Sequence, residues 1–137
     1  MTEDKFIEWK AFFNEALTFS ESETKLTNLT RALPSIYQKA IGILTDQLQE
    51  VKTIGLVRDE IYSKLYSNQK IGQGRSYSSK EIDILIKSEK KYVDICVEYN
   101  KQEVYFKYLE ATIDNIKKIS FQIKNYIDMK KFFAGDY

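Results

Sequence analysis

The last third of the sequence carries a heptad repeat, and this pattern constrains the fold more than any other feature. Mostly apolar residues recur there at alternating steps of three and four over about five repeats, which is the spacing of a coiled-coil helix. Because a helix rises about 1.5 Å per residue, residues 81–131 would form a rod of roughly 75 Å. The repeat consists of Tyr92, Ile95, Tyr99, Gln102, Phe106, Leu109, Ile113, Ile116, Ser120, Ile123 and Ile127.

Such a rod is long for a chain of 137 residues, because the remaining residues are too few to cover it. The apolar stripe therefore predicts partner chains and a homo-oligomer. One flank of the stripe changes from acidic to basic along Glu103, Glu110, Lys117, Lys124 and Lys131. That polarity favours an antiparallel or staggered neighbour, because unlike charges then meet. The residues expected to form the oligomer interface are Phe106, Leu109, Ile113, Ile116, Ile123 and Ile127.

Two further helices are predicted upstream of the rod. Aromatic residues at helical spacing from Phe6 to Phe13 indicate a short amphipathic helix, and we assign residues 1–33 to this helix and its connection. Pro34 fits the first turn of a helix, where its missing N–H costs nothing, so a middle helix is expected over residues 35–66.

A flexible basic loop is expected over residues 67–79, which include Gly72 and Gly74. Ser78 and Glu81 have the spacing of a capping box, so the C-terminal oligomerisation helix is placed at 80–137, with Gly135 just past its regular end. The sequence thus predicts an all-α fold. It is a single helical domain over 1–137, in which a long helical hairpin with a coiled-coil-like C-terminal helix follows a short N-terminal helix.

Composition removes most enzyme classes. The chain has no histidine, which is the commonest general base and zinc ligand, and its one cysteine, Cys96, is expected to be a packed thiol. The Gly-x-Gly at Gly72 and Gly74 lacks the Gly-Lys-Ser/Thr of a phosphate loop and is better explained as an exposed hinge. No apolar run reaches the ~20 residues of a membrane span. We expect no enzyme, no cofactor, no metal and no membrane partner, in a reducing, intracellular setting.

The middle of the chain is locally basic and contains interleaved tyrosines. Lysine and arginine neutralise phosphates while tyrosine rings stack on unpaired bases, which is the combination that single-stranded nucleic acid requires. Two alternatives remain open. In the first, the tyrosines are core residues. In the second, the lysines and arginines do not form one stripe, because successive basic residues lie about 120° apart around the helix. The candidate DNA-binding residues are Arg58, Tyr62, Lys64, Tyr66, Lys70 and Arg75.

The C-terminal residues resemble a known family. The segment Phe-Gln-Ile-Lys-Asn-Tyr-Ile-Asp-Met-Lys-Lys-Phe-Phe-Ala-Gly at 121–135 is similar to the C-terminal signature of the UvsY recombination mediators of T-even-like phages. Ser-Lys-Leu-Tyr at 63–66 looks like the element that closes their middle helix. Family members can carry a Lys-x-Arg pair before that element, where this chain has Arg58, Asp59 and Glu60, so Lys64 is the basic position that matches.

The resemblance implies a non-enzymatic protein that binds single-stranded DNA and assembles into a ring of about six or seven subunits. It implies that this protein helps to load a phage recombinase onto strands coated by the phage single-strand-binding protein, in the cytoplasm of the infected bacterial host. The alternative from another functional class is a structural coiled-coil or scaffolding protein with no nucleic-acid role.

Overall fold

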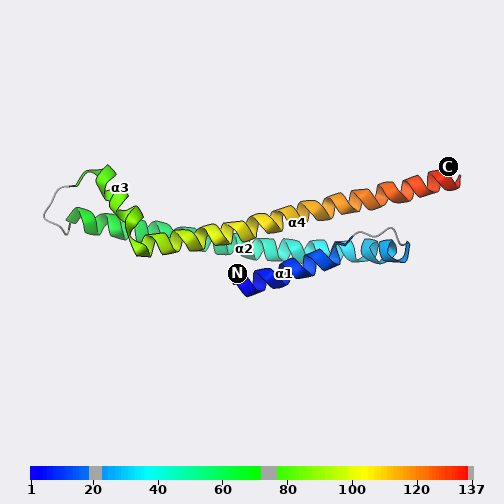
Figure 1. Cartoon of the computed structure of the whole chain (residues 1–137), viewed down its shortest axis with the longest axis horizontal. Coiled ribbons are helices and arrows are strands. Elements are labelled where there is room, and N and C mark those ends of the chain that lie inside the picture. The colour runs from blue at the N-terminus through cyan, green and yellow to red at the C-terminus, as the bar shows by residue number, and fades with distance from the viewer. Residues whose placement is uncertain (19–22, 72–76, 136–137) are drawn as a thin grey trace. The chain divides into compact units, whose positions relative to one another are not determined.

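The structure is a computed structural model that describes residues 1–18, 23–71 and 77–135. The described residues form four helices, α1 (Glu3–Ala16), α2 (Glu23–Ile71), α3 (Ser79–Ser88) and α4 (Lys90–Ala134), shown in Figure 1. The described ranges contain no β-strand, and the predicted all-α fold is confirmed. Within them, no helix has both the length and the apolar character needed to cross a membrane.

The helices pack as two units, which we describe separately. Unit 1 comprises residues 1–46 and 107–137, and unit 2 comprises residues 47–106. In unit 1, α1 packs with the first part of α2 and the last part of α4. Unit 2 contains the rest of α2, all of α3 and the first part of α4.

The aromatic face of α1 docks inside unit 1. Phe13 is 1% exposed, and the ring centroid of Phe6 lies 5.2 Å from that of Tyr108 on α4, edge to face. The Lys39 ammonium, from α2, lies 4.4 Å from the centroid of the Phe12 ring and 5.2 Å from that of Trp9. The start of α1 is capped by Thr2, whose Oγ1 accepts a hydrogen bond from the Lys5 amide. The short N-terminal helix therefore covers both long helices.

This packing corrects the expectation that the chain cannot cover its own apolar rod. The core of unit 1 combines α1 residues with stripes on α2 and α4, and on α4 it uses positions of the predicted heptad seam as well as neighbours. Its buried residues are Phe13, Leu17, Leu26, Leu29, Leu33, Ile36, Ala40, Leu109, Ile113, Ile116, Ile119 and Ile123. Ser120 and Ile127, which also belong to the predicted seam, are exposed. The segment from Leu109 to Ile123 is thus covered within one chain.

The predicted boundary at Pro34 is wrong, because α2 begins at Glu23 and contains Pro34 in its interior. A proline inside a helix leaves the carbonyl one turn earlier, that of Thr30, without an amide partner and costs about 3 kcal/mol. The apolar stripe nevertheless continues through the proline on one face, from Leu26 to Ala40, and is buried throughout. Core packing along this stripe outweighs the local cost.

The C-terminal boundary of the same helix also differs from the prediction. Helix α2 continues to Ile71, so the first residues of the expected loop 67–79 are helical. Residues 72–76, which include Gly72, Gly74 and Arg75, lie outside the described residues.

The helix start predicted at residue 80 is correct to within one residue, since α3 begins at Ser79 and Ser78 Oγ accepts a hydrogen bond from the Glu81 amide. The single rod is wrong, however, because Glu89 adopts an extended conformation (φ −70°, ψ 127°) between α3 and α4. If the heptad pattern continued from Tyr92 towards the N-terminus, two polar residues, Ser88 and Glu81, would lie in the seam. The break instead changes the direction of the chain, so that α3 buries two of its apolar residues, Ile82 and Ile86, and leaves Ile84 and Leu85 exposed.

The far end of α4 follows the prediction. Helix α4 ends at Ala134, and Gly135 has a positive φ of 75°, which favours glycine because it has no Cβ.

A buried amide pair joins the two long helices within unit 2. Gln47 is 2% exposed and Gln102 1% exposed. Gln47 Nε2 donates to the Gln102 backbone oxygen at 2.9 Å and to Gln102 Oε1 at 2.8 Å, and Gln102 Nε2 donates to Glu98 Oε1 at 2.9 Å. An unpaired buried amide is costly, so this geometry favours one register of α2 against α4.

Candidate nucleic-acid interface

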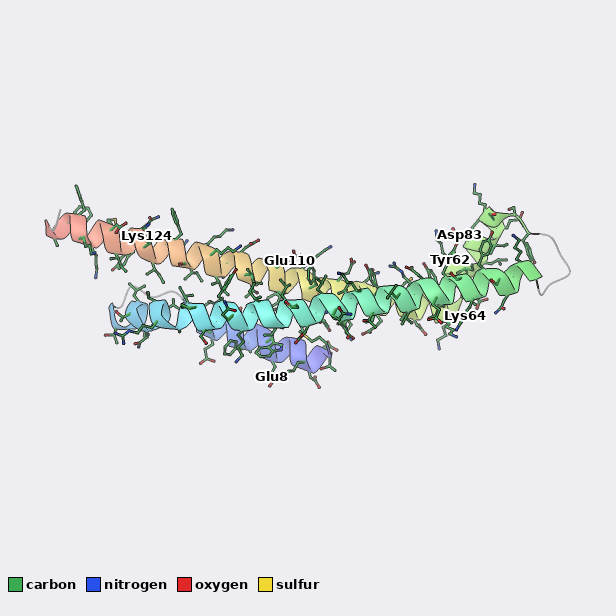
Figure 2. The ribbon with its side chains drawn as sticks, turned by 180° about the vertical axis from the view of Figure 1, so that it is seen from behind. Glu8, Tyr62, Lys64, Asp83, Glu110 and Lys124 are labelled. Atoms are coloured by element: carbon green, nitrogen blue, oxygen red, sulfur yellow. The ribbon has the colours of Figure 1, made fainter. Side chains whose placement is uncertain are left out.

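The candidate DNA-binding residues of α2 do not share one surface. Arg58, Tyr62, Tyr66 and Lys70 follow one another in steps of four, which keeps them on one side of a helix. The Tyr62 and Tyr66 rings are stacked, with centroids 6.4 Å apart and an interplanar angle of 26°. Lys64 is two residues from each tyrosine, about 200° around the helix. Figure 2 shows Lys64 on a different side of α2 from Tyr62.

The two tyrosines hold α3 against α2. The Tyr62 hydroxyl donates to Asp83 Oδ1 at 2.6 Å, and the Tyr66 hydroxyl lies 3.2 Å from Ser79 Oγ. The Tyr62 ring also meets the ring of Tyr92 edge to face, with centroids 5.7 Å apart. Both tyrosines are half-buried. Their contacts match the alternative in which these side chains are packing residues.

Arg58 also makes packing contacts within unit 2. Its guanidinium lies 4.2 Å from the centroid of the Tyr99 ring on α4, and its Nε lies 3.3 Å from Asp59 Oδ1. Gly55, one turn earlier, lets the Tyr99 ring approach, because a Cβ there would lie only 3.2 Å from a ring carbon. Arg58 therefore contributes to the contact between α2 and α4 in unit 2.

Among the described residues of the predicted set, Lys64 and Lys70 are the exposed cations. Lys64 Nζ lies 3.2 Å from Glu60 Oε1, and the two side chains are 71% and 64% exposed. A pair this exposed contributes little to stability, so the lysine can exchange its carboxylate for a phosphate at small cost. Lys70 lies in the last turn of α2, and within the described ranges it has no carboxylate partner. Arg75 lies outside the described residues.

The contact between Tyr62 and Asp83 shifts the ionisation of both groups. The hydrogen bond from Tyr62, followed by the one from Lys87, lowers the pKa of the Asp83 carboxyl. Lys87 Nζ lies 2.9 Å from Asp83 Oδ2, and the hydrogen bond to Asp83 raises the pKa of Lys87. The hydrogen bond to Asp83 also raises the pKa of Tyr62 to about 12. This cluster therefore favours the ionised carboxylate of Asp83, the neutral phenol of Tyr62 and the charged ammonium of Lys87.

Asp83→Asn is expected to loosen α3 in a pH-dependent way. Because the folded-state pKa of Asp83 is lowered, its stabilising effect is present above the usual aspartate pKa of about 3.9 and is lost as pH falls through the folded value. Hydrogen exchange of α3 amides should therefore be faster in the variant than in the parent at neutral pH, and this difference should disappear in strong acid. At high pH, the contribution of Tyr62 is lost as pH rises through about 12.

Asp94→Asn is the matched control for this experiment, because Asp94 is exposed in unit 2. It should leave α3 exchange unchanged. Equal exchange in the Asp83 variant and the parent at every pH would mean that the contact does not hold α3.

Asp83, Tyr92 and Tyr99 are partners of the predicted site that no local sequence signal indicates. The heptad spacing places Tyr92 and Tyr99 only in the seam, and the position of Asp83 depends on the break at Glu89. Within the described ranges, no group of three or more carboxylate or thiol side chains is arranged to hold a metal ion. The arrangement offers cations and packed aromatic rings for binding.

The family match and the structural similarity of this chain agree with each other. Residues 3–136 match the family described as recombination, repair and ssDNA binding protein UvsY. The fold is similar to crystal structures of the bacteriophage T4 recombination mediator protein UvsY. Lattice type II gives a TM-score of 0.80 at 17% identity, covering 98% of each chain. Lattice type IV gives 0.78 at 16% identity, covering 93% of this chain and 97% of that one. The comparison with curated proteins found no match to this chain.

Proposed function

Because this chain belongs to the UvsY family of recombination, repair and single-stranded-DNA-binding proteins, we propose that it is a recombination mediator that loads a phage recombinase onto single-stranded DNA. The strand would be covered beforehand by the phage single-strand-binding protein. The observation that carries the proposal is the family match over nearly the whole chain. We place its action in the cytoplasm of the infected bacterial host, and we assign it no catalytic step of its own.

In unit 2, the proposed phosphate contacts are Lys64 and Lys70. Both are exposed in the last turns of α2. Arg58, Tyr62 and Tyr66 would then position these lysines by keeping the end of α2 fixed against α3 and α4. Arg75, which follows Lys70 by five residues in the sequence, is the remaining proposed phosphate contact.

Assembly is proposed to use apolar residues of α4 that the core of unit 1 leaves exposed. Exposed large apolar side chains that cluster in sequence mark contact surfaces. They are Phe121, Met129, Phe132 and Phe133. Of the residues predicted for the interface, Ile127 is exposed but lines a hollow of unit 1 beside Tyr126, whereas Leu109, Ile113, Ile116 and Ile123 are core residues of unit 1.

Assembly explains how weak lysine contacts could suffice. Each protomer offers few cations, but once one protomer is bound, the others meet the strand at a high effective concentration. A strand held by many protomers would be kept in a shape that weakens its contacts with the coat protein. No nucleotide hydrolysis by this chain is required, because the exchange would be driven by binding energy.

Single-strand binding is expected to fall with rising salt and to be insensitive to base sequence. Neutralising Lys64 and Lys70 to Ala should weaken binding of a fluorescent oligonucleotide. It should also reduce the slope of log affinity against log salt by about 1.4, because each phosphate contact on a single strand contributes about 0.7. Fluorescence anisotropy over a range of salt concentrations measures both quantities.

The matched control replaces Lys52 and Lys91, two exposed lysines of unit 2 outside the proposed contact, with Ala. It removes the same charge and should leave most of the slope intact. Affinity that does not change with salt, or a strong preference for one base sequence, would contradict the proposal.

A further inference from the structure

A groove in unit 1 lies between the first part of α2 and the last part of α4, the helix segments drawn in light blue to cyan and in orange to red in Figure 1. It consists of two hollows of about 430 and 600 Å³ that share Thr30. The first is bordered by Tyr37 and Lys117, and the second by Arg31, Tyr126 and Lys130, among others. On α4 the groove extends from Ile116 to Ala134, about 27 Å of helix.

The charge of the groove has one sign. Its ionisable cations are Arg31, Lys117, Lys130 and Lys131, and none of the described residues that line it carries a carboxylate. All four cations are exposed, and within the described ranges none of them is ion-paired. Lys64, by contrast, is paired with Glu60. The groove therefore concentrates cations with no carboxylate partner, which attract an anionic ligand.

The walls of the groove also suit an unpaired nucleotide. Tyr37 borders one hollow and Tyr126 the other, and both rings are half-buried. Leu33, Pro34 and Ile127 add apolar surface, and Thr30 adds a hydroxyl. The Lys130 ammonium lies 5.2 Å from the centroid of the Tyr126 ring, so a cation and an aromatic surface meet at one point. Phosphate neutralisation beside aromatic surfaces is the chemistry of single-strand binding.

We propose that this groove is a second contact surface for single-stranded DNA, in addition to the lysines of unit 2. Arg31, Lys130 and Lys131 neutralise phosphates at one end, Lys117 does so at the other, and Tyr126 and Tyr37 contact bases or sugars. The inference rests on the proposed function, because it assumes that the chain binds single strands. It also gives a role to Lys117 and Lys131, two lysines of the charged flank beside the heptad seam, because both line the groove.

The test compares two triple variants with the same charge change. Arg31, Lys130 and Lys131 are replaced with Ala in the groove variant, and Lys10, Lys107 and Lys118 in the control; these three exposed lysines of unit 1 do not line the groove. The groove variant should bind a fluorescent oligonucleotide about tenfold or more weakly, with a salt slope reduced by about 2. The control should retain most of the slope.

Two further measurements make the result decisive. The charge-retaining variant with Arg31→Lys, Lys130→Arg and Lys131→Arg should keep the salt slope of the parent. Photo-cross-linking of the parent to an oligonucleotide that contains 5-iodouracil should modify Tyr126 or Tyr37, located by mass spectrometry.

Each alternative has its own outcome. A parent that binds no single strand would overturn the proposed function and this inference together. A parent that binds, with equal slopes in the groove variant and the control or with cross-links confined to residues 47–106, would overturn this inference alone. If the groove variant binds normally per protomer but has a changed mass by light scattering, the groove is an interface between copies of the chain.

Discussion

Replacing both Ile116 and Ile123 with Asp is expected to unfold the chain rather than to release folded monomers. Both isoleucines are 3% exposed in the core of unit 1, where α1, α2 and α4 meet. Losing each side chain costs about 2–5 kcal/mol, and a buried carboxylate without a partner adds several more. This sum reaches the 5–15 kcal/mol of a typical domain, so far-UV circular dichroism should show a large loss of helicity.

The control for this variant is Ser120→Asp, an exposed position on the same helix between the two isoleucines. It introduces the same carboxylate and should retain the helicity of the parent. Ile116→Val and Ile123→Val should each cost only about 0.5–1.5 kcal/mol in urea unfolding. If the double aspartate variant retained full helicity and became monomeric, these residues would instead form an interface between chains.

Replacing Phe132 and Phe133 with Ser is expected to reduce the assembled mass without unfolding the protomer. The two side chains are 68% and 78% exposed at the end of α4, so the protomer loses little packing when they become polar. In the proposed assembly, burial of each phenylalanine contributes about 1.5–3 kcal/mol per protomer. Light scattering should show a shift from the parent's mass towards the 16.1 kDa of a single chain.

Ile7→Ser with Leu56→Ser is the control, because these apolar residues are 57% and 71% exposed but do not lie on α4. It should leave the mass unchanged. A parent of monomer mass, or an unchanged mass in the phenylalanine variant, would rule out assembly through the end of α4.

Short sequence motifs correctly predict the features of the fold that depend only on neighbouring residues. The cap at Ser78 and the glycine at Gly135 were placed correctly, because each depends on a few neighbouring residues. Pro34 was misjudged because its helix-breaking effect is local, whereas the stripe that overrides it gains its energy from packing in unit 1. The break at Glu89 is visible in the sequence only as polar residues in the seam.

The candidate site was harder to predict, because it depends on which faces the fold occupies. The four-residue spacing of Arg58, Tyr62 and Tyr66 correctly placed them on one face. The spacing could not show that α3 and α4 cover this face, through Asp83 and Tyr99. The groove of unit 1 joins segments of α2 and α4 that lie far apart in the sequence, so no local motif indicates it.

The most direct test of the proposed function measures recombinase loading. Single-stranded DNA is first covered with the phage single-strand-binding protein, and the strand-dependent ATP hydrolysis of the phage recombinase is then followed with and without this chain. The proposal predicts a shorter lag and a higher rate when the chain is present, and a smaller effect for the Lys64 and Lys70 variant. No change in lag or rate, at concentrations where the chain binds the coated strand, would contradict it.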